Sequence, residues 1–361
     1  MADLAIAQID PDFWRGRRVL LTGHTGFKGA WLCVLLRELR AEVTGFGAGE
    51  PTSPSLFGTL KLGRRVTSVT GDVRDPRAVQ RGFEEGRPDV VIHMAAQALV
   101  RRSYEDPVGT YATNVLGTAN VLEVARAEPS LHAVLIVTSD KCYRLPPDGR
   151  PCAEDDPLGG EDPYSSSKAC AELVTAAYRD SFARDGGPAI ASARAGNVIG
   201  GGDWAPDRLV PDAMRAGLDG LPFAVRNPNA VRPWQHVLNP LAGYLVLVER
   251  LCSDPDAAGP WNIGPDPRDE RPVSEVAAAV CELWGEGLAW EATDMGGPAE
   301  APVLRIDSTK AREQLGWHPA WDLDDALRAT VSWFRRYRDA TAADTTVEQA
   351  RAYLAGEPPP V

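Results

Sequence analysis

A short apolar run at residues 18–22 passes directly into a turn with glycines at positions 23, 26 and 29. Apolar residues then recur at helical spacing through residues 30–40, so the segment reads as strand, turn and helix. Such a turn points free backbone N–H groups and the positive end of the helix dipole at its ligand, for which a pyrophosphate is the natural group. The spacing is not GxGxxG, and Phe27-Lys28-Gly29 lacks the ending of a P-loop, which argues against a nucleoside triphosphate. The alternative for the glycines alone is a tight connection without a ligand.

Strands and helices alternate through the first two hundred residues. Further strands are predicted at residues 43–46, 66–69, 90–93, 133–138 and 189–194, and further helices at residues 106–127 and 164–179. This alternation predicts an α/β fold, a Rossmann-type doubly wound parallel sheet with a smaller C-terminal α/β substrate-binding lobe. We assign residues 1–195 to the dinucleotide-binding domain, 196–345 mainly to the lobe, and 346–361 to a C-terminal tail. The tail's last residues, GEPPPV, are expected to be disordered.

Composition restricts the possible partners and compartment. The 361 residues carry a formal net charge of −12, which argues against nucleic acid or an anionic membrane as a partner. Residues 1–18 show no secretory signal, and no apolar run approaches the length of a membrane span. The six cysteines lack CxxC spacing, so neither a metal site nor a disulfide framework is expected. We therefore expect a cytoplasmic protein.

The residues beyond the first strand leave the type of dinucleotide open. Asp72 follows the third predicted strand and could hydrogen-bond an adenine amino group or merely cap a turn. Glu50 is the only acid near the end of the second strand, where dinucleotide folds usually place one for the ribose. Arg64 and Arg65 are near enough in sequence to contact an adenosine 2′-phosphate. NAD is the expected cofactor, and NADP is not excluded.

Tyr164 and Lys168 lie one helical turn apart on one face of a predicted helix. A tyrosine with a pKa of about 10 is a poor base, but a nearby ammonium and an oxidised nicotinamide both favour its phenolate. Such a phenolate can remove a hydroxyl proton while the carbon loses a hydride to the cofactor. The alternative is a surface pair without a catalytic role.

With the glycine turn and five strands before them, these residues resemble the extended, nucleotide-sugar branch of the short-chain dehydrogenase/reductase superfamily. Ser139, at the end of AVLIVT, matches the hydroxyl that assists the tyrosine there. Asp140 and Lys141 follow, at the positions that distinguish sugar 4,6-dehydratases from epimerases in this branch. Loss of water from C5 and C6 of a 4-keto sugar needs a base at C5 and an acid at the C6 hydroxyl. A salt-bridged loop pair is the alternative for Asp140 and Lys141.

The chain as a whole resembles the CDP-glucose 4,6-dehydratase family over nearly its entire length. The stretches that carry this resemblance are TGHTGFKGAWL, EPTSPSLF, HMAAQALVRRSYEDPVGTYATNVLGT, VTSDKCY, EDDPLGGEDPYSSSKACAELV, RAGNVIGGGDWAPDRLVPD and RNPNAVRPWQHVL. The chain departs from the family at residues 298–304, PAEAPVL, which lack the family's histidines and tyrosine, and at Glu161, where a tyrosine is expected. Both departures could change substrate binding or specificity.

The resemblance implies a set of contacts and an activity. Cofactor contacts are implied at Gly23, Thr25, Gly26, Phe27, Gly29, Asp72, Val73, Ala95, Ala96, Asn114, Tyr164 and Lys168. Substrate contacts are implied at Arg102, Ser103 and Tyr104 for the sugar and at Asn197, Arg208 and Arg232 for the nucleotide or diphosphate; for Arg208 and Arg232 the alternative is a domain-stabilising ion pair. The expected cycle has Tyr164 deprotonating the glucose 4-hydroxyl as hydride leaves C4 for NAD, Lys141 removing the C5 proton, Asp140 protonating the departing C6 hydroxyl, and hydride returning to C6.

Two other function classes remain as alternatives. A nucleotide-sugar epimerase, or a dehydratase for another nucleotide, would use the same Ser139, Tyr164 and Lys168. A protein that senses dinucleotides without catalysis would keep the fold but would have no need of Tyr164 and Lys168. By analogy with the superfamily we expect a homodimer formed through two helices of each subunit.

Overall fold

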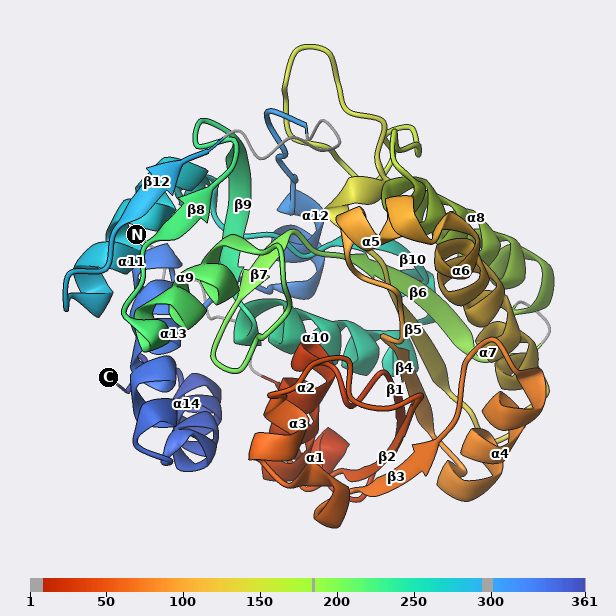
Figure 1. Cartoon of the computed structure of the whole chain (residues 1–361). Helices are drawn as coiled ribbons and strands as arrows, with labels where there is room; N and C mark the ends of the chain where they lie inside the picture. The colour runs from red at the N-terminus through yellow and green to blue at the C-terminus, as the bar shows by residue number, and fades with distance from the viewer. Residues whose placement is uncertain (1–8, 184–185, 294–300, 361) are drawn as a thin grey trace.

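A computed structural model describes residues 9–183, 186–293 and 301–360 and has a seven-stranded sheet at its centre (Figure 1). The strand order is β10-β6-β5-β4-β1-β2-β3, and every neighbouring pair is parallel. The strands are β1 (Arg18–Thr22), β2 (Glu42–Gly47), β3 (Thr67–Thr70), β4 (Val90–His93), β5 (Ala133–Val137), β6 (Ala189–Arg194) and β10 (Gly259–Asn262). The predicted Rossmann-type fold is confirmed, and each of the six predicted strands is present at its expected place.

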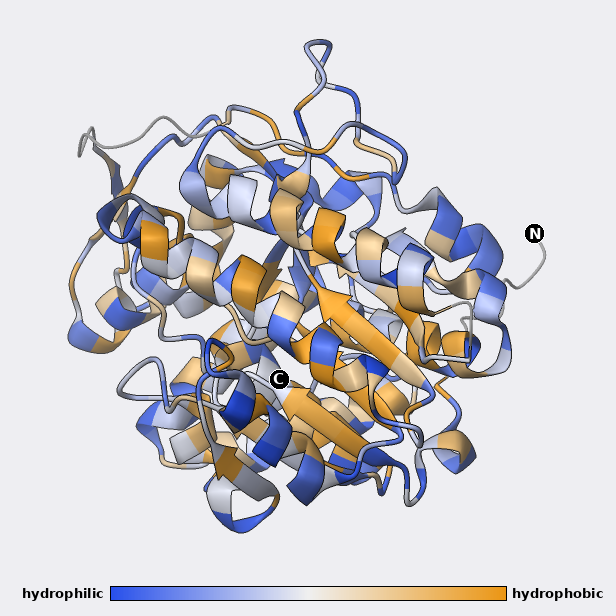
Figure 2. Ribbon diagram, turned by 90° about the vertical axis from the view of Figure 1, so that its right-hand side faces the viewer, coloured by the Kyte–Doolittle hydropathy of each residue, from blue (hydrophilic) through white to orange (hydrophobic). Residues whose placement is uncertain are grey.

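Helices cover both faces of this sheet, because successive residues of a strand point to opposite sides. Val19 and Leu21 of β1 belong to one apolar core, and Leu20 between them belongs to the other. The first core is covered by α2 (Phe27–Glu38) and α10 (Leu238–Ser253). The second core is covered by α4 (Pro76–Gly86), α7 (Gly117–Arg126) and α8 (Pro163–Phe182), which lie on the side shown in Figure 2.

The long helix predicted at residues 106–127 is not uniform. The chain forms α5 (Val100–Glu105), α6 (Pro107–Tyr111), a π turn (Ala112–Leu116) and then α7. Asp106 ends the first of these helices and caps the second, since its side chain accepts a hydrogen bond from the Gly109 amide at 2.8 Å. A π turn inserts one extra residue and leaves the apolar pattern of a helix nearly unchanged, so the sequence pattern does not reveal it.

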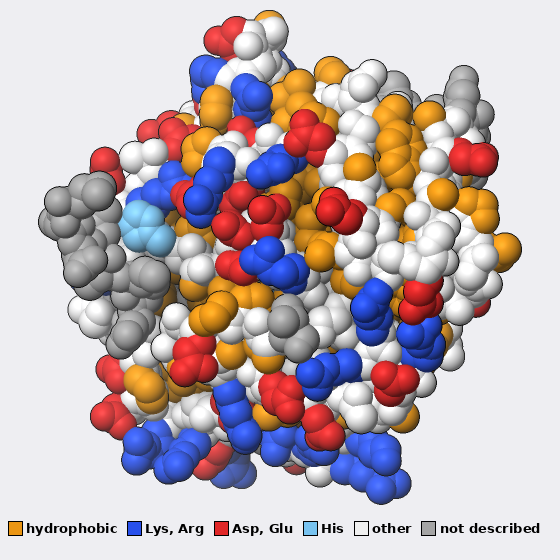
Figure 3. Space-filling model, turned by 90° about the vertical axis from the view of Figure 1, so that its left-hand side faces the viewer, with side chains coloured by type: hydrophobic (Ala, Val, Ile, Leu, Met, Phe, Trp, Pro, Cys, Tyr) orange, Lys and Arg blue, Asp and Glu red, His pale blue; other side chains and the backbone are white. Residues whose placement is uncertain are grey.

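In the described residues, the C-terminal lobe contains two small sheets and a group of helices. The strands are β7 (Asn197–Ile199), β9 (Val231–His236) and β11 (Glu270–Pro272) in one sheet, and β8 (Phe223–Val225) and β12 (Trp290–Ala292) in the other. The helices are α9 (Leu209–Asp219), α11 (Val273–Trp284), α12 (Thr309–Leu315) and α13 (Leu323–Arg338). Basic and acidic side chains are intermingled over this side of the molecule (Figure 3). Two elements that follow residue 195, α10 and β10, belong with the central sheet. The proposed division at residue 195 therefore divides the sequence but does not separate the two parts in space.

The C-terminal segment is ordered, so the expected disorder of GEPPPV is wrong for residues 356–360. Residues up to 354 belong to a helix, α14 (Ala342–Leu354), and Tyr353 packs edge-on against Trp321 at 5.2 Å between ring centroids. The Trp321 indole N–H donates to the Glu357 carbonyl at 2.9 Å, and Pro359 is buried. An aromatic anchor in the coil before α13, Trp321, thus holds a proline-rich end that has no pattern of its own. Val361 lies outside the described residues.

Two single-turn helices complete the N-terminal part, α1 (Pro11–Trp14) and α3 (Leu56–Thr59), the second of which lies beside α2 (Figure 1). Across the described ranges, every helix is too short or too polar to cross a membrane.

Candidate active site

The predicted site residues gather where β1, β4 and β5 end, at the point where the order of the strands reverses. The chain passes from β1 to β2 on one side of that point and from β4 to β5 on the other, and in folds of this kind ligands bind outside the carboxyl ends of such strands. The glycine turn follows β1, the coil of residues 94–99 follows β4, and Ser139 follows β5. The fold therefore brings together segments more than one hundred residues apart.

The glycine turn is shaped by contacts that exclude side chains. A Cβ on Gly23 would lie 2.8 Å from the amide nitrogen of Ala95, so the turn packs directly against the coil after β4. Gly23 also has a φ of +74°, which a side chain would disfavour. A Cβ on Gly29 would lie only 2.2 Å from the Gly23 carbonyl oxygen.

This turn fits the pyrophosphate of a dinucleotide. Gly26 is the N-cap of α2 and no side chain caps that end of the helix. The first amides of the helix are therefore free to donate to a ligand, and the helix dipole adds positive potential there. An uncapped helix end beside a turn with glycines at its close contacts matches the cradle that the sequence predicts.

We expect Gly29→Ala to lower both the melting temperature and the affinity for NAD. The new methyl group meets the backbone of Gly23 and His24, which has no rotamer to change, and overpacking of this kind costs about 1–3 kcal/mol. Thermal unfolding and a fluorescence titration with NAD measure the two effects. Gly63→Ala is the control, because its Cβ makes only ordinary contact with Phe57 at 3.5 Å. Wild-type NAD affinity in Gly29→Ala would contradict the assignment of the turn.

The remaining predicted cofactor residues differ in what they contact. Thr25 donates to the Gly49 carbonyl at 2.6 Å, and the carbonyl of Val73 accepts from Asn120 at 2.9 Å. Asp72 pairs with Arg74 at 2.6 Å, and the Arg74 guanidinium is the first cause of the lowered pKa of that carboxyl. Phe27 opens α2, and Ala96 lies in the coil after β4.

Asn114 is fully engaged inside the protein. In the π turn its side-chain oxygen accepts from the amide of Gln97 at 2.8 Å, while its nitrogen donates to the Gln97 carbonyl at 3.0 Å and to Ser167 at 2.8 Å. It therefore ties the coil after β4 to α8. The geometry gives Asn114 the role of holding this coil, which a resemblance to a family's contact residues does not reveal.

Arg64 and Arg65 lie at the opposite edge of the sheet from the glycine turn. They line a groove together with Arg18 and Glu42, which begin β1 and β2, whereas the glycine turn follows the carboxyl end of β1. Neither arginine is therefore placed to contact an adenosine 2′-phosphate. Glu50, the acid near the end of β2, is hydrogen-bonded by Ser55.

Tyr164 and Lys168 form a buried pair on α8. Burial raises the pKa of Tyr164 to about 12, and a hydrogen bond with Ser139 acts in the opposite direction. Burial lowers the pKa of Lys168 to about 8, while the charge of Glu172 raises it. The Lys168 ammonium also donates to the Val137 carbonyl at 3.2 Å, which fixes it at the end of β5.

Asp140 and Lys141 lie in a 3₁₀ turn (Asp140–Cys142) directly after Ser139. The hydroxyl of Ser139 donates to one oxygen of Asp140 at 3.0 Å and accepts from the Lys141 amide at 3.2 Å. The other carboxylate oxygen of Asp140 is buried and has no hydrogen-bond partner in the described part of the chain. A buried carboxylate oxygen without a partner is costly, and such groups are characteristic of sites that bind or transfer protons.

The predicted sugar-binding residues divide into internal and exposed side chains. Ser103 is fully buried; its hydroxyl donates to the Val100 carbonyl at 2.6 Å and accepts from the Tyr164 amide at 3.1 Å. It therefore holds the first turn of α8. Tyr104 is 46% exposed, and partial burial, followed by the charges of Asp162 and Glu161, raises the pKa of its phenol. Arg102 lies beside them on α5.

The predicted nucleotide-binding residues come from the C-terminal lobe. Asn197 begins β7, and Arg232 is buried in the neighbouring strand β9. Arg208 precedes α9 and pairs with Asp203 at 3.0 Å. The segment that departs from the family runs beside β9, where Leu304 donates to the Val231 carbonyl at 3.1 Å; residues 298–300 lie outside the described residues.

Lys28 is a site residue to which sequence reasoning gave no role. Its ammonium donates to the hydroxyl of Tyr244 on α10 at 3.0 Å. Burial, with the charges of Lys168 and Arg208, lowers the pKa of Lys28 to about 7, whereas Asp140 opposes this effect. The position of Lys28 in the turn was visible in the sequence, but its partner is more than two hundred residues away.

Comparisons with known proteins identify the family of the chain. A model of the NAD dependent epimerase/dehydratase family matches residues 19–264. CDP-glucose 4,6-dehydratase of Salmonella typhimurium is 45% identical over 339 residues, which are 91% of this chain and 93% of that protein. dTDP-glucose 4,6-dehydratase of Xanthomonas campestris is 28% identical over 341 residues, 87% of this chain and 92% of that protein.

A solved structure gives the same result for the fold. The crystal structure of Thermus thermophilus UDP-glucose 4-epimerase, a complex with NAD, superposes with a TM-score of 0.75. The two chains are 27% identical, and the match covers 88% of this chain and 99% of the epimerase.

Proposed function

The chain belongs to the NAD dependent epimerase/dehydratase family, and from this premise we propose that it is an enzyme that converts CDP-glucose to CDP-4-keto-6-deoxyglucose and water. The high identity to a CDP-glucose 4,6-dehydratase over most of both chains supports the substrate and the reaction. Within the family, the residues after β5 favour dehydration over epimerisation.

The observation that carries this proposal is the turn after Ser139. Epimerisation at C4 needs a group that exchanges the hydroxyl proton, and Tyr164 with Ser139 suffices for that. Elimination of water across C5 and C6 needs two further proton-transfer groups. Asp140 and Lys141 supply them, and the buried, unpartnered oxygen of Asp140 is a group that a substrate hydroxyl can satisfy.

Oxidation at C4 uses the residues of α8. Tyr164 accepts the proton of the 4-hydroxyl, and the Ser139 hydroxyl and the charge of Arg208 favour the phenolate that this requires. Lys168, one turn further along α8, is assigned to the same role. The glycine turn would hold NAD, which when bound would supply the acceptor for the C4 hydride and the source of the hydride for C6, while Lys141 gives its proton back to C5.

Elimination uses the turn after β5. A carbonyl at C4 makes the C5 proton acidic, and Lys141 removes it. Asp140 then protonates the departing C6 hydroxyl through its free oxygen. Both steps give a reactive intermediate that water would intercept, so we propose that the lobe carrying β7 and β9 closes over the sugar.

The nucleotide half of the substrate is assigned to the lobe. Arg208 and Arg232, with Asn197 between the two parts of the chain, provide local positive charge and hydrogen-bond donors in a protein of net charge −12. Arg102 and Tyr104 are assigned to the sugar.

Incubation of the purified protein with CDP-glucose tests the proposal. The product's 4-keto group absorbs in alkali, and we expect it from CDP-glucose with NAD added. Parallel reactions contain dTDP-glucose, UDP-glucose and GDP-mannose, and the Asp140→Asn, Lys141→Ala double variant serves as the control without elimination.

Each outcome of this experiment decides between function classes. Product from another nucleotide-sugar in place of CDP-glucose would move the specificity to that nucleotide. CDP-galactose as the product would indicate an epimerase. No reaction with any sugar, despite NAD binding, would support a dinucleotide-sensing protein and overturn the proposal.

We further propose a cytoplasmic homodimer. Apolar side chains are exposed on adjacent helical segments, with Val108 78%, Leu116 52% and Leu173 59% exposed. They belong to α6, the π turn and α8, which run side by side (Figure 2), and contiguous exposed apolar surface favours association. Sedimentation equilibrium should give twice the 38.8 kDa of one chain, and the monomer mass would contradict this.

The proposed cytoplasmic location is supported by the cysteines, because six free cysteines suit a reducing compartment.

A further inference from the structure

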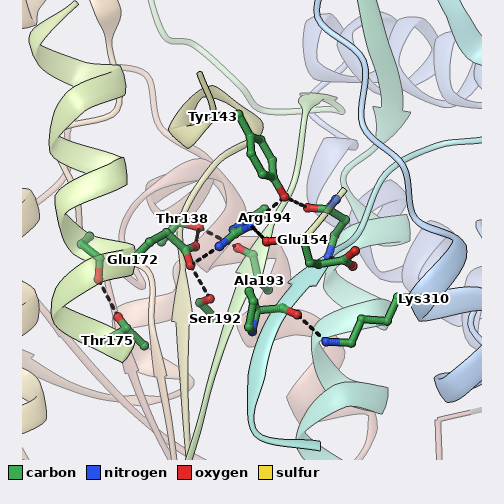
Figure 4. Close-up of polar contacts among 12 residues, drawn as sticks. Thr138, Tyr143, Glu154, Glu172, Thr175, Ser192, Ala193, Arg194 and Lys310 are labelled. Carbon is green, nitrogen blue, oxygen red and sulfur yellow. Dashed lines mark hydrogen bonds and ion pairs between the residues drawn. The ribbon is translucent and has the colours of Figure 1, made fainter. Parts of the chain in front are cut away.

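A buried ion pair lies directly behind the turn that carries Asp140 and Lys141. Glu172 of α8 and Arg194 of β6 are each only 3% exposed, and their nearest atoms are 2.8 Å apart (Figure 4). The hydroxyl of Ser192 donates to the same oxygen of Glu172 at 2.7 Å. None of these three residues was singled out by the sequence analysis.

The same pair holds both ends of the turn. On one side, the hydroxyl of Thr138 donates to the second oxygen of Glu172. On the other side, Arg194 donates to the hydroxyl of Tyr143 at 2.7 Å and its guanidinium lies 4.8 Å from the centre of that ring. Figure 4 shows Thr138 beside Glu172 and Tyr143 beside Arg194. Ser139, Asp140 and Lys141 lie between these two attachment points.

The Tyr143 hydroxyl also connects the turn to the edge strand of the sheet. It donates to Asn262 of β10 at 2.6 Å. The side-chain nitrogen of Asn262 donates to the carbonyls of Cys152 and Asp307 at 2.9 and 2.8 Å. The backbone N–H of Asn262 donates to the Glu154 carboxylate at 2.8 Å. The Tyr143 hydroxyl therefore connects the catalytic turn to β10 and, through Asn262, to residues 152–154 and 307.

Stability alone does not explain such a pair. Replacing a buried ion pair by apolar residues is often neutral or stabilising, because the cost of removing two charges from water offsets their attraction. Directional hydrogen bonds from a planar guanidinium do restrict the position of their partners. The arrangement is therefore suited to fixing the turn.

We propose that Glu172 and Arg194 are positioning residues that act through Thr138 and Tyr143 to hold Asp140 and Lys141 at C6 and C5 of the sugar during elimination. The inference rests on the proposed function. Tyr164 and Lys168 are held by α8 and lie outside the turn, and Ser139 is the one oxidation residue within it. When the attachment of the turn to the ion pair is weakened, elimination across C5 and C6 should therefore slow more than oxidation at C4.

Tyr143→Phe is the most selective test. It removes the hydroxyl but keeps the ring that stacks on Arg194. The charge of Glu172 raises the pKa of Lys168, so a variant of Glu172 itself would also alter oxidation. Tyr353→Phe is the matched control, because the Tyr353 hydroxyl is also buried and donates to an asparagine, Asn239, at 3.0 Å.

The measurement separates the two half-reactions. Single turnovers of CDP-glucose are quenched at intervals, and mass spectrometry quantifies the 4-keto sugar before and after loss of water. In Tyr143→Phe we expect elimination to slow by about 10-fold or more, since small misplacements of catalytic groups have effects of this size. Oxidation should stay within about 2-fold of wild type, so that the undehydrated 4-keto sugar accumulates.

Three results would decide against the inference. Equal slowing of both steps would mean a general structural role, and unchanged elimination would mean that the turn keeps its position without the hydroxyl. Accumulation in Tyr353→Phe as well would make the effect non-specific. If Tyr143→Phe fails to fold, Thr138→Val replaces it. This variant releases the other end of the turn and should also accumulate the undehydrated 4-keto sugar. A wild-type protein without any 4-keto product would instead refute the proposed function.

Discussion

Tyr164→Phe is expected to reduce formation of the 4-keto product from CDP-glucose by about 10²–10⁴-fold, the usual contribution of a positioned general base. The variant keeps the buried ring and loses only the hydroxyl that takes the proton of the sugar 4-hydroxyl. Stopped-flow measurement of sugar oxidation isolates this step from the later elimination. The melting temperature should remain close to wild type, because the buried ring is kept.

The same helix offers a matched control for this variant. Tyr178 also lies on α8, and its hydroxyl donates to Glu123 at 3.1 Å, away from the site. Tyr178→Phe should therefore retain full activity. Wild-type oxidation in Tyr164→Phe, or an equal loss in Tyr178→Phe, would remove Tyr164 from its assigned role.

The pH dependence gives an independent view of Tyr164. Burial raises the pKa of this phenol to about 12 and the hydrogen bond with Ser139 lowers it, so the rate of oxidation should rise with pH as the phenolate fraction rises. Ser139→Ala removes the opposing contribution and should shift this rise to higher pH.

Lys141→Ala is expected to suppress exchange of the C5 proton with deuterium from solvent by about 10²-fold or more, while C4 oxidation continues. The lysine side chain is the base assigned to C5 and has no assigned part in oxidation at C4, and the backbone amide that donates to Ser139 remains in the variant. Nuclear magnetic resonance of the sugar recovered from D₂O measures the exchange directly.

Asp140→Asn distinguishes the two proton-transfer groups of the turn. Asparagine can still accept the hydrogen bond from Ser139 but has no acidic proton for the C6 hydroxyl. Exchange at C5 should therefore persist while water is retained in the sugar. Undiminished exchange in Lys141→Ala would transfer the role of C5 base to another group.

Much of the fold and of the catalytic set could be predicted because the signals are local. The apolar runs at residues 18–22 and 90–93 are buried on both faces of the sheet. A continuous apolar run of this kind is typical of a strand in a parallel sheet. Tyr164 and Lys168 are one turn apart on any helix, and the uncapped start of α2 follows from the glycines themselves. The order of these motifs then indicated the superfamily.

Residues with long-range partners were beyond such reasoning. Ser103 and Asn114 lie in segments that resemble a family's binding residues, yet their side chains hold Tyr164 and the coil after β4 in place. Arg64 and Arg65 are close in sequence to the cofactor strands but lie at the opposite edge of the sheet.

The amino-acid sequence by itself determined the parallel sheet, the glycine cradle and the succession of Ser139, Asp140 and Lys141 after a buried strand, since each depends on residues within a few positions of one another. Only the tertiary structure decided what surrounds them. Lys28 meets Tyr244 across the two parts of the chain. Glu172, Arg194 and Tyr143 meet behind the catalytic turn. Such contacts depend on how distant elements pack, and no periodicity or spacing along the chain records them.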